Sequence, residues 1–340
     1  MASAEPMRLL PPQDRLPYPS RLTPRRARAG GVALGAALAG LAWGGIVERN
    51  LFTLRRVTVR ALPPGATPFT VLHISDLHMA PWQHRKQAWL RGLAALHPDL
   101  IVDTGDNLGH REGLTGLRRA LEAFRGTPGV YVNGSNDYFA PHPHNPLRYF
   151  TGPSRHSKTA ERLDTASMER YFDDLGWVGL DNTAAGLDVR GTRVEFLGVD
   201  DPHRGFDRLE LVVGALDQLR EETAFDDDEE AERDLPAITI GVTHAPYRRV
   251  LNSFVTHGAQ AIFAGHTHGG QICLPFFGAL VTNCDLPRRQ AKGLSLWRNG
   301  FRSAYLNVSA GVGTSIYAPV RFACRPEASL VTFEPGERTR

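Results

Sequence analysis

Short apolar runs alternate with longer amphipathic stretches over most of the chain, and this alternation predicts a layered α/β domain. Buried strands are expected, in chain order, at 69–75, 100–102, 130–132, 177–180, 186–189, 194–199, 238–242 and 261–263. Apolar spacing of three or four residues predicts helices at 89–96, 111–124, 166–175, 209–221 and 250–255. The section after residue 276 is rich in turns, with further strands expected near 303–308 and 328–333.

The N-terminal part of the chain has a different pattern. Residues 1–28 are rich in Pro and Arg without apolar periodicity, which predicts a disordered tail. Residues 29–47 then run without a charge, and a helix of this length would reach roughly 28 Å, close to the thickness of a bilayer core. We expect a transmembrane or signal-anchor helix there, although a cleaved export signal or a helix packed on the domain also fits. Residues 48–67 are expected to form a linker and a first strand at 57–59.

Charge constrains the partners of this chain. Arginines before the uncharged run (15, 21, 25, 26 and 28) slightly outnumber those after it (49, 55, 56 and 60), which favours a membrane-anchored protein with its catalytic domain outside the cytoplasm. The formal net charge of +3 is too small to indicate nucleic-acid binding, and the sequence has no basic stripe interleaved with aromatic residues. We therefore expect a membrane partner through residues 29–47 and no nucleic acid.

Potential metal ligands follow strand after strand in the expected sheet. They are Asp76 and His78, Asp106, Asn136, His244, and His266 and His268. Sites in open α/β sheets lie at the carboxyl ends of strands, so these side chains are expected to converge. Mixed oxygen and nitrogen ligands suit Mn, Fe, Zn or Co. One carboxylate with ligands on both sides predicts two divalent transition metals, the arrangement that stabilises attacking and leaving oxygens in phosphoryl displacement.

These residues resemble the motifs of the calcineurin-like metallophosphoesterases. The matching motifs are Asp76-x-His78, Gly105-Asp106, the Gly and Asn residues at 134–137, His244, and Gly265-His266-x-His268, and the resemblance covers about residues 68–335. The run Gly-His-Thr-His-Gly-Gly-Gln at 265–271 is similar to a branch of membrane-associated bacterial phosphoesterases that includes UDP-2,3-diacylglucosamine pyrophosphatase-like enzymes.

The resemblance implies a fold and a ligand set. The fold is of the α/β (α+β) class, a four-layer αββα sandwich of two mixed sheets flanked by helices. Asp76, His78 and His268 would hold the first metal, Asp106 would bridge, and Asn136, His244 and His266 would hold the second. The family's metals activate a hydroxide that attacks phosphorus in line.

One motif departs from the family, which has Gly-Asn-His-Asp/Glu where this chain has Gly134-Ser135-Asn136-Asp137. Aligning the glycines places Ser135 at the ligand position and Asn136 at the histidine position. Aligning the upstream strand instead places Asn136 at the ligand and Asp137 at the histidine. We expect the second alignment, because an amide oxygen is the better ligand. It makes Asn136 and Asp137 the candidate catalytic pair.

The usual histidine is absent in either alignment. Asp137 could act as a general acid only with a raised pKa. His110, His142 or His144 could instead take the histidine's place, and activity is expected to be slow or restricted to good leaving groups.

The expected function is hydrolysis of a phosphodiester or pyrophosphate bond, on a substrate with a lipid or nucleotide part. The alternatives are a nuclease or cyclic-nucleotide phosphodiesterase, and a non-catalytic metal-binding membrane protein. The altered Asn136-Asp137 motif motivates the last of these.

Overall fold

The computed structural model describes residues 35, 38–143, 160–227, 237–274 and 276–336. The chain divides into two units, Met1–Gly40 and Leu41–Arg340. The expected tail at 1–28 and residues 29–34, 36 and 37 of the expected membrane helix lie outside the described residues. Within the described ranges, no helix combines the length and the apolar character needed to cross a membrane.

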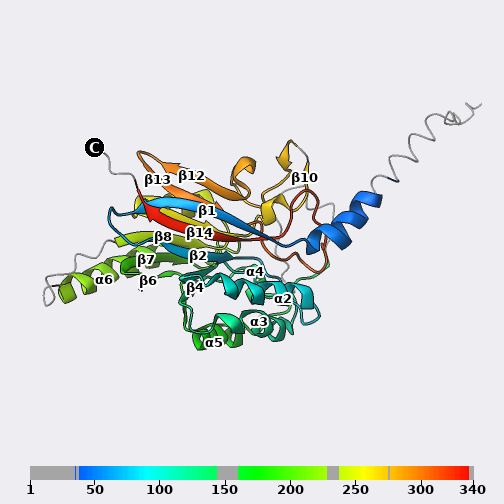
Figure 1. Ribbon diagram of the computed structural model, residues 1–340, viewed down its shortest axis with the longest axis horizontal. Coiled ribbons are helices and arrows are strands. Elements are labelled where there is room, and N and C mark those ends of the chain that lie inside the picture. The colour runs from blue at the N-terminus through cyan, green and yellow to red at the C-terminus, as the bar shows by residue number, and fades with distance from the viewer. Residues whose placement is uncertain (1–34, 36–37, 144–159, 228–236, 275, 337–340) are drawn as a thin grey trace, which may run out of the picture. The chain divides into compact units, whose positions relative to one another are not determined.

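Two six-stranded sheets organise the second unit (Figure 1). The first sheet has the order β1 (Thr53–Leu62), β14 (Glu327–Pro335), β2 (Phe69–Ile74), β3 (Leu100–Asp103), β4 (Gly129–Tyr131), β5 (Trp177–Gly179). Strands β2 to β5 pair in parallel, whereas β14 is antiparallel to β2 and parallel to β1. This sheet is therefore mixed.

The second sheet is also mixed. Its order is β12 (Gly293–Asn299), β13 (Arg302–Val308), β9 (Ala261–Ala264), β8 (Ala237–Thr243), β7 (Thr192–Val199), β6 (Thr183–Val189). The four central strands β13, β9, β8 and β7 are parallel, and an antiparallel strand closes each edge. A separate two-stranded hairpin joins β10 (Cys273–Leu274) to β11 (Gly278–Ala279).

Alternate residues of the central strands point to opposite faces of each sheet, and both faces are buried. Val71 and Val102 of the first sheet and Ile240 and Phe263 of the second share one buried core, so the two sheets pack face to face. The opposite face of the first sheet is covered by α2 (His84–Gly92), α3 (Gly113–Leu121) and α5 (Thr165–Leu175). The opposite face of the second is covered by α6 (Leu209–Asp227) and α7 (Arg248–Thr256). The expected sandwich of two mixed sheets flanked by helices is confirmed.

Short helices complete the described chain. The one-turn α4 (Ser135–Tyr138) follows β4, and the π-helical η1 (Trp43–Val47) precedes β1. The 3₁₀ segments are η2 (Glu48–Asn50), η3 (Leu93–Leu96), η4 (Glu122–Phe124), η6 (His268–Gly270) and η7 (Arg288–Gln290).

Two features differ from the sequence expectation. The first strand, expected at 57–59, runs over Thr53–Leu62 as β1, an edge strand of the first sheet paired with β14 near the other end of the chain. β12 was not expected, because its seven residues lie in a turn-rich section and are buried in an irregular pattern.

Candidate metal centre

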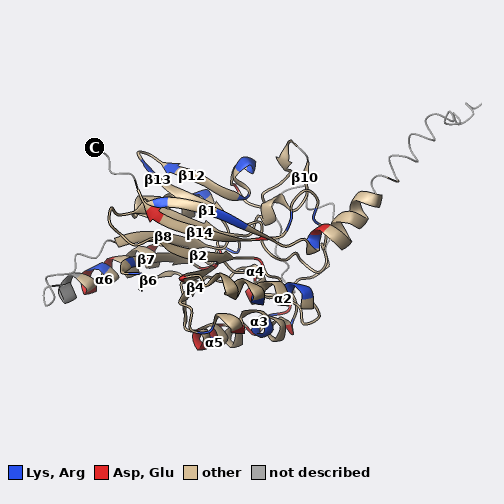
Figure 2. Cartoon of the chain, viewed as in Figure 1, with Lys and Arg blue, Asp and Glu red and all other residues tan. Residues whose placement is uncertain are grey.

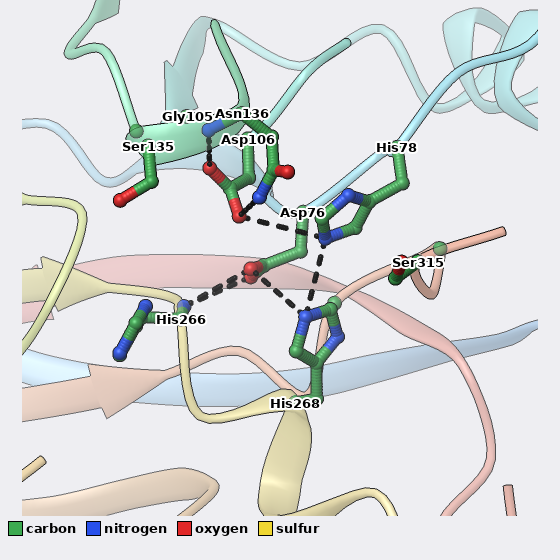
Figure 3. A network of polar contacts seen from close by, with 12 residues as sticks. Asp76, His78, Gly105, Asp106, Ser135, Asn136, His266, His268 and Ser315 are labelled. Atoms are coloured by element: carbon green, nitrogen blue, oxygen red, sulfur yellow. Dashed lines mark hydrogen bonds and ion pairs between the residues drawn. The ribbon is translucent and has the colours of Figure 1, made fainter. Parts of the chain in front are cut away.

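The expected ligands meet where the carboxyl ends of the central strands of both sheets come together (Figure 3). Asp76 and Asp106 lie in the loops after the neighbouring strands β2 and β3. His244 and His266 lie in the loops after the neighbouring strands β8 and β9. Parallel pairing within each sheet brings these loops to one edge, and face-to-face packing brings the two edges together. The site therefore lies between the sheets.

One group of ligands consists of Asp76, His78 and His268, with one ligand atom from each within 4.8 Å of the others. The Nε2 atoms of His78 and His268 are 3.2 Å apart, and the His268 Nε2 is 3.5 Å from Asp76 Oδ1. Two imidazole nitrogens and a carboxylate oxygen around one point form a suitable set for a divalent transition metal.

A second group consists of Asp76, Asp106 and His244, again with one ligand atom each within 4.8 Å. Asp76 belongs to both groups, and Asp106, a member of the second, also faces a histidine of the first. Its Oδ2 is 3.5 Å from His78 Nε2, and its Oδ1 is 3.5 Å from His244 Nε2. One carboxylate that presents each oxygen to a different histidine has the geometry of a bridging ligand.

His266 is not a member of either group, but its Nδ1 lies 3.2 Å from His244 Nε2. The outer nitrogen of His244, Nδ1, donates to the Thr104 carbonyl at 2.8 Å, so its Nε2 is left to face the cluster. The backbone N–H of His266 also donates to both oxygens of Asp76, at 3.2 and 3.0 Å. These contacts fix the side chains before any ion binds.

Backbone strain is concentrated in these residues. Asp76, His78, Asp106, His266 and His268 all have positive φ, between 40° and 67°. Non-glycine residues rarely adopt this conformation, and where they do the cost is held by the surrounding structure. Five such residues in one site indicate that the fold holds these loops for a function.

The protonation of the histidines suits metal binding. Burial lowers the pKa of His78 to about 4 and that of His268 to about 3, so both rings are neutral at pH 7 and present lone pairs. Burial also acts to lower the pKa of His244, but the carboxylates of Asp106, Asp76 and Asp201 outweigh it and raise the pKa to about 9. A cation at this position would replace that proton, because a metal binds the neutral ring.

The residues thus fit two divalent ions. A family model described as calcineurin-like phosphoesterase matches residues 69–270, which is more than half of the chain and contains all the candidate ligands above. The chain belongs to the calcineurin-like phosphoesterase family. The family uses divalent metals, and the two ligand groups are candidates to hold them.

Two curated relatives from Bacillus subtilis (strain 168) are similar over nearly the whole chain. The uncharacterized metallophosphoesterase YkuE is 24% identical over 318 residues, covering 90% of this chain and 94% of its own. The uncharacterized protein YpbG is 25% identical over 308 residues, covering 88% of this chain and 92% of its own.

Solved structures to which the chain was matched include a dimetal phosphatase from Danio rerio. It is 11% identical, with a TM-score of 0.39, and the match covers 79% of this chain and 93% of that one. The protein TT1561 of Thermus thermophilus is 14% identical, with a TM-score of 0.38, and the match covers 72% of this chain and 91% of that one.

Asn136 lies against Asp106, the candidate bridging residue. Its backbone N–H and its side-chain Nδ2 each donate to one oxygen of Asp106, both at 2.7 Å. The amide oxygen points away from Asp106 (Figure 3). Asn136 therefore orients Asp106 and has one oxygen left for a metal or a substrate.

The surroundings of the Asp137 carboxylate differ from those expected of a general acid, which must reach the substrate. This carboxylate is fully buried and accepts backbone N–H bonds from Gly134, Asp106, Asn107 and Leu108, at 2.9, 2.8, 2.7 and 3.1 Å. Burial and the Asp106 charge raise the pKa of Asp137, while bonds from these donors oppose that rise by stabilising the ionised form. This placement favours a positioning role over the general-acid role considered from the sequence.

The loop after β7 contributes residues that the sequence reasoning missed. The Ser135 hydroxyl donates to buried Asp201, which also accepts the His203 N–H at 2.8 Å. The His203 ring lies on His266, with centroids 4.4 Å apart, and its Nδ1 is 3.0 Å from the Tyr247 hydroxyl. The run Asp200-Asp201-Pro202-His203 directly after a strand was the available signal.

Arg204 extends this loop beside α4. Its guanidinium carbon lies 4.0 Å from the centre of the Phe139 ring. Burial lowers the pKa of Arg204, and the carboxylates of Asp201 and Asp106 act in the opposite direction, so the cation lies within reach of the site's negative charges.

Three histidines were considered as replacements for the family histidine, and the structure describes two of them. The His110 ring packs edge-on against Trp82, with centroids 4.9 Å apart, and its Nδ1 accepts the Glu112 N–H. His142 is described and half-buried, whereas His144 lies outside the described residues.

Proposed function

We propose that this protein hydrolyses a phosphodiester or pyrophosphate bond on a lipid- or nucleotide-linked substrate. The observation that carries the proposal is the position of Asp106, whose two oxygens each lie 3.5 Å from a histidine of a different ligand group. The divalent ions that such a site binds supply an activated water and neutralise charge on the phosphoryl oxygens. Family membership supports phosphohydrolase chemistry, and the diester or pyrophosphate preference is the part proposed here.

Each residue has a task in the proposal. Asp76, His78 and His268 would hold one ion, His244 and His266 the other, and Asp106 both. Asn136 keeps the Asp106 carboxylate oriented through two hydrogen bonds. Asp137 holds the Asp106 loop in its strained conformation.

Arg204 is proposed to bind a phosphoryl oxygen of the substrate. Its planar fork of donors matches phosphate geometry. Stacking on Phe139 fixes the side chain without using those donors. The family histidine is absent, so Arg204 would provide positive charge that the altered motif lacks.

We also propose that the chain is anchored in a membrane through residues 29–47, with the catalytic domain outside the cytoplasm. The length of the uncharged run and the slight excess of arginine before it support this proposal.

Hydrolysis of two chromogenic esters tests the proposed activity. Purified protein with Mn²⁺ should hydrolyse bis(p-nitrophenyl) phosphate faster than p-nitrophenyl phosphate. Asp106→Asn should abolish turnover, whereas the exposed Asp188→Asn should leave it unchanged. Metal-dependent turnover of the monoester alone would contradict the diester preference. No turnover on a broad panel, with metal bound, would favour the non-catalytic alternative.

A further inference from the structure

The tip of the β10–β11 hairpin exposes adjacent apolar side chains. Phe276 is fully exposed, and Leu274 and Phe277 are 47% and 59% exposed. Single exposed apolar residues are common on soluble proteins, but a cluster of large ones on a single turn indicates a contact surface. We refer to Leu274, Phe276 and Phe277 as the hairpin tip.

Cations lie beside the hairpin tip. Arg288, Arg289 and Lys292 line the same groove as the three apolar residues, and we refer to them as the basic rim. The Arg288 guanidinium carbon lies 4.9 Å from the centre of the Phe277 ring. The hairpin itself has no charged residue, and η7, which carries Arg288 and Arg289, is blue in Figure 2. The surface is apolar at its centre and positive at its edge.

The chain's uncharged N-terminal run ends next to this surface. The Cys273 N–H at the base of the hairpin donates to the Phe322 carbonyl at 2.8 Å, and the adjacent Arg321 N–H donates to the Gly44 carbonyl at 3.1 Å. Trp43 and Ile46, on either side of that glycine, are 47% and 70% exposed. The loop around residues 321–322 therefore connects the hairpin to the end of the run.

A second groove also connects the hairpin region to the end of the uncharged run. It is lined by residues that include Glu48 and Arg325, and it shares Lys292 and Ala323 with the groove of the hairpin tip. The two grooves therefore adjoin at Lys292 and Ala323, close to the loop that contacts η1.

We propose that the hairpin tip inserts into the interfacial layer of a bilayer that contains anionic lipids. Aromatic and aliphatic side chains enter the boundary between headgroups and acyl chains, while Arg and Lys pair with anionic headgroups. The uncharged run that ends at Val47 argues for a bilayer as the occupant, because a membrane helix there would place η1 at the membrane surface. This contact rests on the membrane anchoring proposed above, and not on the proposed hydrolysis.

Quenching by brominated lipids tests the contact in the full-length protein. Phe277→Trp and, as a matched control, Phe301→Trp are reconstituted in phosphatidylcholine–phosphatidylglycerol vesicles whose acyl chains carry bromine. Phe301 is also fully exposed but lies alone at the β12–β13 turn. Quenching beyond that of the unsubstituted protein should be several-fold greater for Phe277→Trp than for Phe301→Trp. Arg288→Glu/Arg289→Glu in the Phe277→Trp background should reduce it, and more so with phosphatidylglycerol present than in pure phosphatidylcholine.

Three results would overturn the proposal. One is equal quenching of the two tryptophan variants, and another is no quenching of either in vesicles. The third is a concentration-dependent blue shift of the Phe277→Trp emission without lipid, which would show that a second copy of the chain covers the tip. Thermal unfolding of each variant checks its fold, and Mn²⁺-dependent hydrolysis in the same samples reports separately on the proposed function. Loss of one readout is therefore distinguishable from loss of the other.

Discussion

The Asp137 carboxylate accepts the backbone N–H of Asp106 at 2.8 Å, and so holds the loop that carries the candidate bridging ligand. Asp137→Ala leaves four buried N–H groups without their acceptor, each of which costs about 1–3 kcal/mol when unsatisfied. We expect the free energy of unfolding of the metal-free protein to fall by at least about 3 kcal/mol. Denaturant unfolding without metal measures this change.

A general acid at this position would behave differently. Replacing it would leave the stability of the metal-free protein intact and would slow only substrates with poor leaving groups. That outcome for Asp137→Ala would contradict the positioning role.

Arg204 has a clear kinetic signature if it binds a phosphoryl oxygen. Arg204→Ala removes a charge-assisted hydrogen bond of about 1.5–3 kcal/mol, which corresponds to a loss of roughly ten- to a hundredfold in kcat/KM. Arg204→Lys should recover part of the loss, and inorganic phosphate should inhibit the alanine variant less strongly. Arg162→Ala is the control, because Arg162 also lies near Phe139, with its guanidinium carbon 5.7 Å from the ring centre. Equal effects of the two alanine variants would assign the loss to packing around Phe139.

Gly265 lies so close to Asp76 that adding a side chain there tests whether metal binding needs Asp76 in place. A Cβ at residue 265 would lie 1.9 Å from Ser75 Oγ and 2.7 Å from Asp76 Oδ2, so Gly265→Ala must displace Asp76. We expect metal binding to be lost. Gly214→Ala is the matched control, since a Cβ there meets nothing within 4 Å, and alanine in a helix should stabilise by about 0.5–1 kcal/mol. Calorimetric Mn²⁺ titration of both variants checks the prediction, which fails if Gly265→Ala binds metal normally.

The buried His73 side chain should cause part of the loss of folding stability at low pH. It is fully buried between Thr104 and Asn307, and burial lowers its pKa to about 3 from an unfolded value of about 6.5. The unfolded chain therefore binds the proton first, and stability is lost as pH falls from about 6.5 towards about 3. The slope from this residue is about 1.4 kcal/mol per pH unit within that window. Urea unfolding at several pH values should show a shallower dependence for His73→Gln, and an unchanged slope would exclude His73 as a source.

The convergence of the candidate ligands could be predicted from the sequence, because each follows a short apolar strand and parallel strands bring their carboxyl ends together. Asp76, His78, Asp106, His244 and His268 all lie in the two ligand groups of the described structure. The surroundings of Asp137 could not be predicted, because the sequence does not show that four backbone N–H groups from two segments point at its carboxylate.

Long-range contacts were also beyond the sequence. The pairing of β1 with β14 joins residues more than 270 positions apart, as in Thr53 with Glu327. The contact of Asp201 with Ser135 depends on how the loop after β7 approaches the short helix α4 after β4, and no local sequence pattern indicates that.

The central claim is that one carboxylate, Asp106, is shared by two metal ions. The most direct test is electron paramagnetic resonance of the Mn²⁺-loaded protein, with metal content measured on the same samples. The account predicts two ions per chain and a spin-coupled spectrum for the native protein. His268→Ala should retain the ion at His244 and His266 with an uncoupled spectrum, and Asp106→Asn should lose the coupling. A single uncoupled ion in the native protein at saturating Mn²⁺ would contradict the account.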